Sequence, residues 1–143
     1  MNRVGTRWIS AAIATYIVAM ALIAFWPTPV DKGAGPWLSS FIATLHSLGV
    51  PKWFSYSAIE FGSNIIFFLP FGFLAMWASR KVWLSLLLGF CVSAMIEFCQ
   101  FLFLPARFPS AWDVLANSLG SLIGALTFAA IARLMARRQL NTV

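Results

Sequence analysis

The chain has 143 residues, of which 61% are hydrophobic and only 10% are charged. A soluble domain has roughly 45–50% apolar and about 25% charged residues, so this composition excludes an ordinary soluble domain and indicates that lipid covers the surface. The net charge of +6 does not indicate a nucleic-acid partner, because the basic residues flank long apolar runs and form no stretch interleaved with aromatic residues.

The first apolar run extends from Trp8 to Trp26, after Arg3 and Arg7 and before Pro27. It is longer than the roughly 7–15 apolar residues of a signal peptide and does not end in small residues before a cleavage site. We therefore expect a retained membrane helix at about residues 8–26.

Three further apolar runs follow, at about residues 56–79, 82–104 and 110–132. Each is close to the roughly 20 residues that a helix needs to cross a bilayer. Helices are expected because every backbone polar group in lipid must be bonded within its own segment. The sequence predicts an all-α integral membrane protein with four transmembrane helices, forming a single domain over residues 1–143.

The segment between the first two runs, Pro27 to Ser55, is long for a simple connection. Apolar residues recur in it at helical spacing, which predicts a short amphipathic helix at about residues 37–48. Its apolar positions are Trp37, Phe41, Ile42, Leu45 and Leu48. This helix lies on the outer membrane–water interface or packs over the bundle as a lid.

The basic residues predict the orientation. If the N-terminus is inside, the cytoplasmic segments contain Arg3, Arg7, Arg80, Lys81, Arg133, Arg137 and Arg138, and the outer segments contain only Lys32, Lys52 and Arg107. This distribution agrees with the positive-inside rule. We expect both termini of a multi-pass protein in the cytoplasm.

A set of polar residues lies near the outer ends of three predicted helices. The carboxylates Glu60, Glu97 and Asp113 stand within apolar runs, where a charge costs about 2.5–3.5 kcal/mol at the helix centre. Each has an amide three or four residues further along, on the same helix face. With the loop arginine the set is Glu60, Asn64, Glu97, Gln100, Arg107, Asp113 and Asn117.

The simplest arrangement of these seven residues is one ligand-binding pocket open to the extracytoplasmic side, in which Arg107 pairs with Asp113 or Glu97. Arginine favours forked recognition of a carboxylate or phosphate, so it can also meet an anionic head group. The alternative is that the polar groups only join the helices, for gains of about 0.6–2 kcal/mol per contact.

No nucleophile–base pair and no metal-ligand pattern is present, so we assign no catalytic residue, no metal site and no cofactor. His46 is the single histidine, and Cys91 and Cys99 lie too far apart on one predicted helix for a disulfide. Acid–base chemistry by Glu60 and Glu97 is the remaining enzymatic alternative. Gly120 and Gly124 form a small-xxx-small pair that predicts a close helix–helix approach.

The order of motifs resembles the VanZ-like family of small bacterial membrane proteins. The resemblance lies in Asn64, Phe67-Phe68-Leu69-Pro70-Phe71-Gly72, Glu97-Phe98-Cys99-Gln100, Arg107, Asp113-Val114-Leu115-Ala116-Asn117-Ser118-Leu119-Gly120 and Gly124. It covers about residues 60–124.

The resemblance implies a bacterial inner-membrane protein related to one associated with low-level resistance to the glycopeptide teicoplanin. We expect a non-enzymatic protein that contacts membrane lipids and binds a lipid-linked cell-envelope intermediate or a lipophilic glycopeptide. The alternatives are an enzyme acting on a lipid-linked envelope substrate and an accessory subunit of an envelope complex. The sequence does not predict an oligomeric state.

Overall fold

The computed structural model describes residues 3–28 and 35–140. They form five helices: α1 (Arg3–Ala24), α2 (Gly35–Ser47), α3 (Tyr56–Ser79), α4 (Val82–Phe103) and α5 (Ala111–Leu140). No strand occurs in these described ranges, so the predicted all-helical fold is confirmed for them. Lys32, predicted to lie in an outer segment, is outside the described residues.

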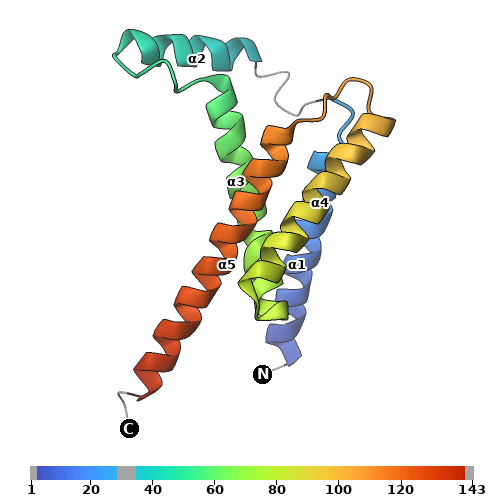
Figure 1. The fold of residues 1–143 in the computed structure, drawn as a ribbon, viewed down its shortest axis with the longest axis vertical. Helices are drawn as coiled ribbons and strands as arrows, with labels where there is room; N and C mark the ends of the chain where they lie inside the picture. The colour runs from blue at the N-terminus through green and yellow to red at the C-terminus, as the bar shows by residue number, and fades with distance from the viewer. Residues whose placement is uncertain (1–2, 29–34, 141–143) are drawn as a thin grey trace.

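Four of the helices run along the long axis of the molecule, and α2 lies across one end (Figure 1). The start of α1 and the end of α5 lie at the opposite end from α2 (Figure 1). The loop between α4 and α5 returns to the α2 end, beside the last turn of α1 (Figure 1). The polar residues near the ends of the predicted helices therefore gather at this end, which we call the α2 end.

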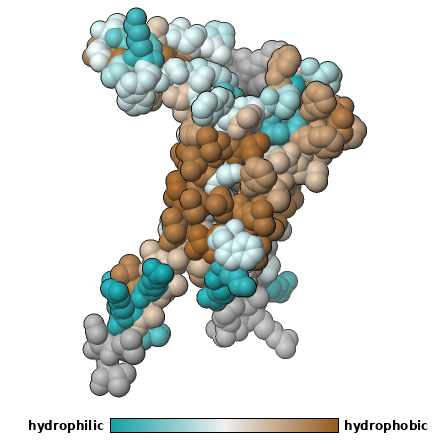
Figure 2. Space-filling view, viewed as in Figure 1, coloured by the Kyte–Doolittle hydropathy of each residue, from teal (hydrophilic) through white to brown (hydrophobic). Residues whose placement is uncertain are grey.

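Three helices, α3, α4 and α5, are long and apolar enough to cross a membrane. In α1 the apolar helical stretch covers Ser10–Ala24 and is shorter than the other three. The fourth crossing and the interfacial position of α2 therefore stay predictions. Figure 2 shows an apolar band across the middle of the molecule between more hydrophilic ends, as expected for a surface in contact with lipid.

Helices α1 and α5 differ most from their predicted bounds, and α1 begins at Arg3 rather than near residue 8. Helix α1 ends at Ala24 rather than near residue 26, because the residue before a proline, here Pro27, is disfavoured in the helical conformation. Helix α5 continues past residue 132 to Leu140. Its additional turns contain arginine and glutamine, which are good helix formers. The apolar pattern therefore predicted the apolar part of α5 and not its full length.

Helices α3 and α5 cross closely through their glycines. A Cβ atom at Gly120 would meet the backbone of Ile65, and one at Gly124 would meet the carbonyl of Leu69. From the α3 side, a Cβ at Gly72 would meet the backbone of Ser121. The predicted close approach at the small-xxx-small pair is confirmed, because only glycine leaves room for the facing backbone.

Helix α4 packs a stripe of small and polar residues against its neighbours. The buried positions recur every three or four residues, as one helix face requires, and are Ser85, Gly89, Ser93, Glu97 and Gln100. The hydroxyl of Ser121 on α5 donates to the carbonyl of Ser85 over 2.9 Å. This face leads from the middle of the molecule to the polar cluster at the α2 end.

Candidate ligand-binding cavity

Two adjoining cavities lie at the α2 end and share part of their walls. The larger has a volume of about 510 Å³ and is lined by Ile23, Leu38, Tyr56, Ile59, Glu60, Ser63, Asn64, Gln100, Ala106, Arg107, Phe108 and Asp113. The smaller, of about 200 Å³, is lined by Ile23, Ala24, Ser63, Asn64, Phe67, Phe68, Ile96, Glu97, Gln100, Arg107, Asp113 and Asn117. All seven residues predicted as a site line one or both cavities.

The start of α5 places Asp113 in the cavity wall. The hydroxyl of Ser110 accepts a hydrogen bond from the Asp113 backbone N–H over 3.3 Å, which caps the first turn of α5. The side chain of Asp113 accepts at Oδ1 from Asn64 Nδ2 over 2.9 Å. This bond joins α5 to α3 inside the polar cluster.

Glu97 joins α4 to the same capping segment. Its side chain is buried, with 8% of its surface exposed. Oε2 accepts a hydrogen bond from the backbone N–H of Ser110 over 2.7 Å. Ser110 therefore bonds the carboxylate of Glu97 through its backbone N–H and the backbone N–H of Asp113 through its hydroxyl.

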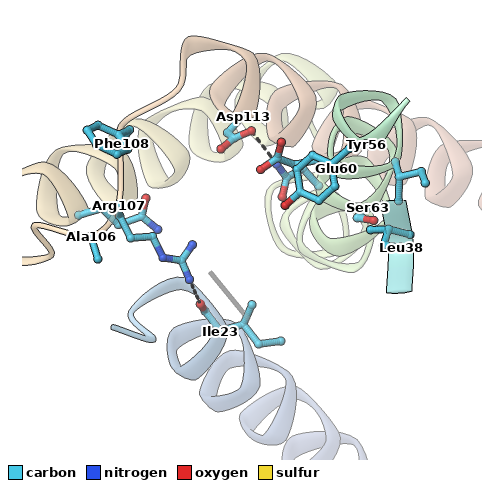
Figure 3. A pocket seen from close by; sticks show the side chains of 12 residues that line it. Ile23, Leu38, Tyr56, Glu60, Ser63, Ala106, Arg107, Phe108 and Asp113 are labelled. Atoms are coloured by element: carbon cyan, nitrogen blue, oxygen red, sulfur yellow. Dashed lines mark hydrogen bonds between the residues drawn. The ribbon is translucent and has the colours of Figure 1, made fainter. Parts of the chain in front are cut away.

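Arg107 binds the end of α1 instead of a carboxylate. Its guanidinium donates to the carbonyls of Ile23, Trp26 and Thr28 over 3.1, 3.3 and 3.4 Å. Figure 3 shows the side chain turned toward Ile23, across the opening from Asp113 and Glu60. The carbonyl of Ile23 belongs to the last turn of α1, where carbonyls carry partial negative charge, and those of Trp26 and Thr28 lie in the segment after the helix. The expected pairing with Glu97 or Asp113 is not among its hydrogen bonds within the described residues.

Gln100 reinforces this contact from α4. Its Nε2 donates to the carbonyl of Ala24 over 2.7 Å, and the bond is buried. Further along α1, the hydroxyl of Tyr16 donates to the carbonyl of Phe67 on α3 over 2.9 Å. Polar bonds therefore hold α1 to the bundle, and two of the donors belong to the cavity wall.

Asn117 lies at the closed end of the smaller cavity and is 6% exposed. Its Nδ2 donates to the hydroxyl of Ser93 over 2.8 Å. Its Oδ1 is buried and has no hydrogen-bond partner among the residues that the structure describes. A buried acceptor without a partner costs about 1–3 kcal/mol unless a bound group supplies a donor.

Glu60 is the exposed carboxylate of the set and lies at the mouth of the larger cavity. It also lines a third cavity of about 630 Å³ on the outer side of α3 and α5, together with Asp113. Aromatic side chains of Trp53, Phe61 and Trp112 form part of that cavity. Phe61 and Trp112 meet edge to face, with ring centroids 6.4 Å apart.

Several wall residues were not predicted from the sequence. Ser110 could have been found, because Ser110-Ala111-Trp112-Asp113 has the spacing of a helix capping box. Ser93 also carries a signal, since it lies four residues before Glu97 on the same helix face. Tyr56, Ser63 and Phe108 show no pattern of their own and are identified only by the packing.

Fold and composition together define a helical membrane protein with a polar cavity at one end. A family model described as VanZ/LLP1 matches residues 13–133, most of the chain. The chain therefore belongs to the VanZ/LLP1 family, and the resemblance seen in the sequence is confirmed. No curated protein and no solved structure matches the chain.

Proposed function

We propose that this protein is a bacterial inner-membrane protein that binds the polar head of a lipid-linked cell-envelope intermediate or a lipophilic glycopeptide. The observation that carries the proposal is the convergence of seven polar residues, far apart in the sequence, on two adjoining cavities. Ligand pockets of this kind have volumes of about 300–1,000 Å³. The larger cavity alone, at about 510 Å³, falls within that range.

The surroundings of the cavity suit an amphiphilic ligand. Phe108, which lines the larger cavity, is 87% exposed, and Phe103, the last residue of α4, is 72% exposed. The apolar band of Figure 2 begins directly below this end. A ligand can place its head group among the polar residues while its apolar part remains in the lipid. This division of contacts agrees with an envelope or antibiotic-resistance role, which family membership also supports.

The proposal includes a fourth crossing by α1 and an extracytoplasmic position of the cavity. The 22 residues of α1 span about 33 Å at about 1.5 Å per residue, enough for the hydrocarbon core. The bonds from Gln100 and Arg107 hold the end of α1 at the level of the cavity. The positive-inside distribution supports cytoplasmic termini and hence an outward-facing cavity.

The substitution Ser63→Phe tests ligand binding. Ser63 lines both cavities and is exposed, so a phenyl group there fills the site without entering the packed core. Native mass spectrometry of protein purified with its own membrane lipids should show a bound species on the wild type that Ser63→Phe loses. Gly62→Phe is the matched control, because a side chain at Gly62 meets open space.

The same pair of variants tests the cellular role. Cells producing the wild-type chain should differ from empty-vector cells in their sensitivity to teicoplanin-type glycopeptides. Ser63→Phe should remove that difference at an equal protein level, whereas Gly62→Phe should retain it. If Ser63→Phe keeps both the bound species and the phenotype, the cavity is not the binding site and the proposed function is wrong.

A further inference from the structure

Three nitrogen-bearing side chains of the cavity wall, Asn64, Gln100 and Arg107, donate hydrogen bonds within the protein. The Nδ2 of Asn64 donates to Asp113, and the Nε2 of Gln100 donates to the carbonyl of Ala24. The guanidinium of Arg107 donates to three carbonyls at the end of α1. Carbonyl and carboxylate oxygens only accept hydrogen bonds, so these bonds fix which end of each amide faces inward to the protein.

Several acceptor oxygens of the wall remain for a ligand. The described hydrogen bonds use one oxygen of Glu97 and one of Asp113, although a carboxylate has about four acceptor positions. At the closed end, Asn117 Oδ1 is buried without a partner among the described residues. An anionic head group would bring further acceptors to these oxygens. The acceptor oxygens therefore favour a ligand that donates hydrogen bonds over the anionic ligand that a loop arginine first suggests.

The charges of the cavity wall also favour a cationic ligand over an anionic one. Glu60, Glu97 and Asp113 line the cavities, and Arg107 is the basic residue among the lining residues. Three carboxylates and one guanidinium leave an excess of negative charge, which attracts a cation and repels an anion. The third cavity, which shares Glu60 and Asp113, adds the aromatic rings of Trp53, Phe61 and Trp112. Aromatic faces also attract cations.

We propose that the cavity recognises a primary ammonium group on a membrane-partitioned ligand. This inference rests on the proposed function and specifies its ligand. A primary ammonium carries three N–H donors and one positive charge. It can donate to the carboxylates of Glu97 and Asp113 and to the unpartnered oxygen of Asn117 within one site. Charge-assisted bonds of this kind are roughly twice as strong as neutral ones.

Four probes with one dodecyl tail separate the possible head groups. Dodecylamine offers a cation with N–H donors, and dodecyltrimethylammonium offers a cation without them. Dodecyl maltoside offers hydroxyl groups, and dodecyl phosphate offers an anion. The shared tail keeps the apolar contribution similar, so differences in binding report the head group.

The readout is protection of a cysteine in the cavity from a maleimide. The full-length chain carries Ser63→Cys together with Cys91→Ala and Cys99→Ala, and is held in phosphatidylcholine nanodiscs. Dodecylamine should protect the cysteine at concentrations roughly tenfold lower than the other three probes, as expected for added charge-assisted bonds. Gly62→Cys in the same background faces open space and should not be protected.

Two substitutions test whether the preference for dodecylamine depends on the residues of the cavity wall. Asp113→Asn should reduce the advantage of dodecylamine, because it removes negative charge at the site. Thr127→Val should retain it, since the Thr127 hydroxyl bonds the carbonyl of Ile123, outside the cavity lining. Two further compounds then identify the source of the ammonium. Protection of Ser63→Cys by phosphatidylethanolamine in the nanodisc indicates an aminolipid, and protection by an alkyl glucosaminide indicates an amino sugar.

Each other outcome has a defined consequence. If dodecyl phosphate or dodecyl maltoside protects best, the ammonium inference is overturned while the proposed binding cavity stands. Equal protection by dodecylamine and dodecyltrimethylammonium also overturns the inference, because N–H donation would then be irrelevant. If none of the four probes protects Ser63→Cys, the inference and the proposed function both fail.

Discussion

At the level of single residues, Arg107 and Gln100 act as clamps on the last turn of α1 and on the segment that follows it, up to Thr28. Together they donate to four carbonyls, those of Ile23, Ala24, Trp26 and Thr28. Within the described residues, α1 makes fewer close backbone contacts with the bundle than α3, α4 and α5 make with one another. These side-chain bonds therefore carry much of the attachment of α1 at the cavity.

Arg107→Lys tests this clamp. A lysine keeps the charge but lacks the forked donors that reach several carbonyls at once. We expect the end of α1 to open more readily, by on the order of 1 kcal/mol, with amide exchange faster by roughly fivefold. Hydrogen–deuterium exchange over residues 20–28 measures the effect. Exchange over residues 116–125 of α5 should stay unchanged. Equal exchange over residues 20–28 in the wild type and in Arg107→Lys would contradict the clamp.

At this scale the sequence predicted which residues gather but not which bonds they make. Their depth in the apolar runs and their spacing on helix faces were sufficient to bring all seven to one pair of cavities. The pairing of Arg107 depended on the position of the end of α1, which no pattern near Arg107 contains. Arg107 therefore bonds backbone carbonyls rather than a carboxylate because the fold brings the end of α1 next to it.

The close crossing of α3 and α5 is the main feature at the level of helices. A Cβ at Gly124 would lie 2.8 Å from the backbone nitrogen of Phe73 and would also meet the carbonyl of Leu69. Backbone atoms cannot turn aside as a flexible side chain can. A single methyl group at this position must therefore separate the two helices.

Gly124→Ala and Gly62→Ala form a matched pair for this crossing. Gly124→Ala should lower the free energy of unfolding by about 1–3 kcal/mol through overpacking. Gly62→Ala should be neutral or raise it by about 0.5–1 kcal/mol, because alanine is the better helix former and the site is open. Thermal unfolding in one detergent compares them. Equal stability of the two variants would show that the crossing tolerates separation.

Helix existence was well predicted from apolar run length, whereas helix ends were not. The runs at 56–79 and 82–104 correspond closely to α3 and α4. Helix α5 exceeds its predicted end because helical conformation does not require apolar residues. Leu38 of α2 lines the larger cavity, so α2 contributes to the cavity wall.

The whole molecule combines an apolar band with a polar cavity at one end (Figures 1 and 2). The start of α1 and the end of α5 both lie at the other end, apart from each other (Figure 1). If α1 crosses the membrane with α3, α4 and α5, both termini face the cytoplasm and the cavity faces outward. The number of crossings decides whether the two termini share a side, and the positive-inside rule predicts that this side is the cytoplasm.

Reporter fusions test this topology. Alkaline phosphatase fused after Val143 should be inactive, and green fluorescent protein at the same position should fluoresce, as expected for a cytoplasmic terminus. Phosphatase inserted in the α4–α5 loop at Ala106 should be active. Active phosphatase after Val143 would mean an odd number of crossings for an N-terminus in the cytoplasm, and would place the cavity on the wrong side.

The most direct test of the account is to locate a bound head group. A bilayer lipid with a diazirine in its head group is photolysed with the purified chain, and the labelled residues are mapped by peptide mass spectrometry. The account predicts adducts concentrated on cavity residues such as Ser63, Phe108 and Tyr56, and lost on adding dodecylamine. Adducts spread over the exposed apolar faces of α1 and α4, with none in the cavity, would contradict it.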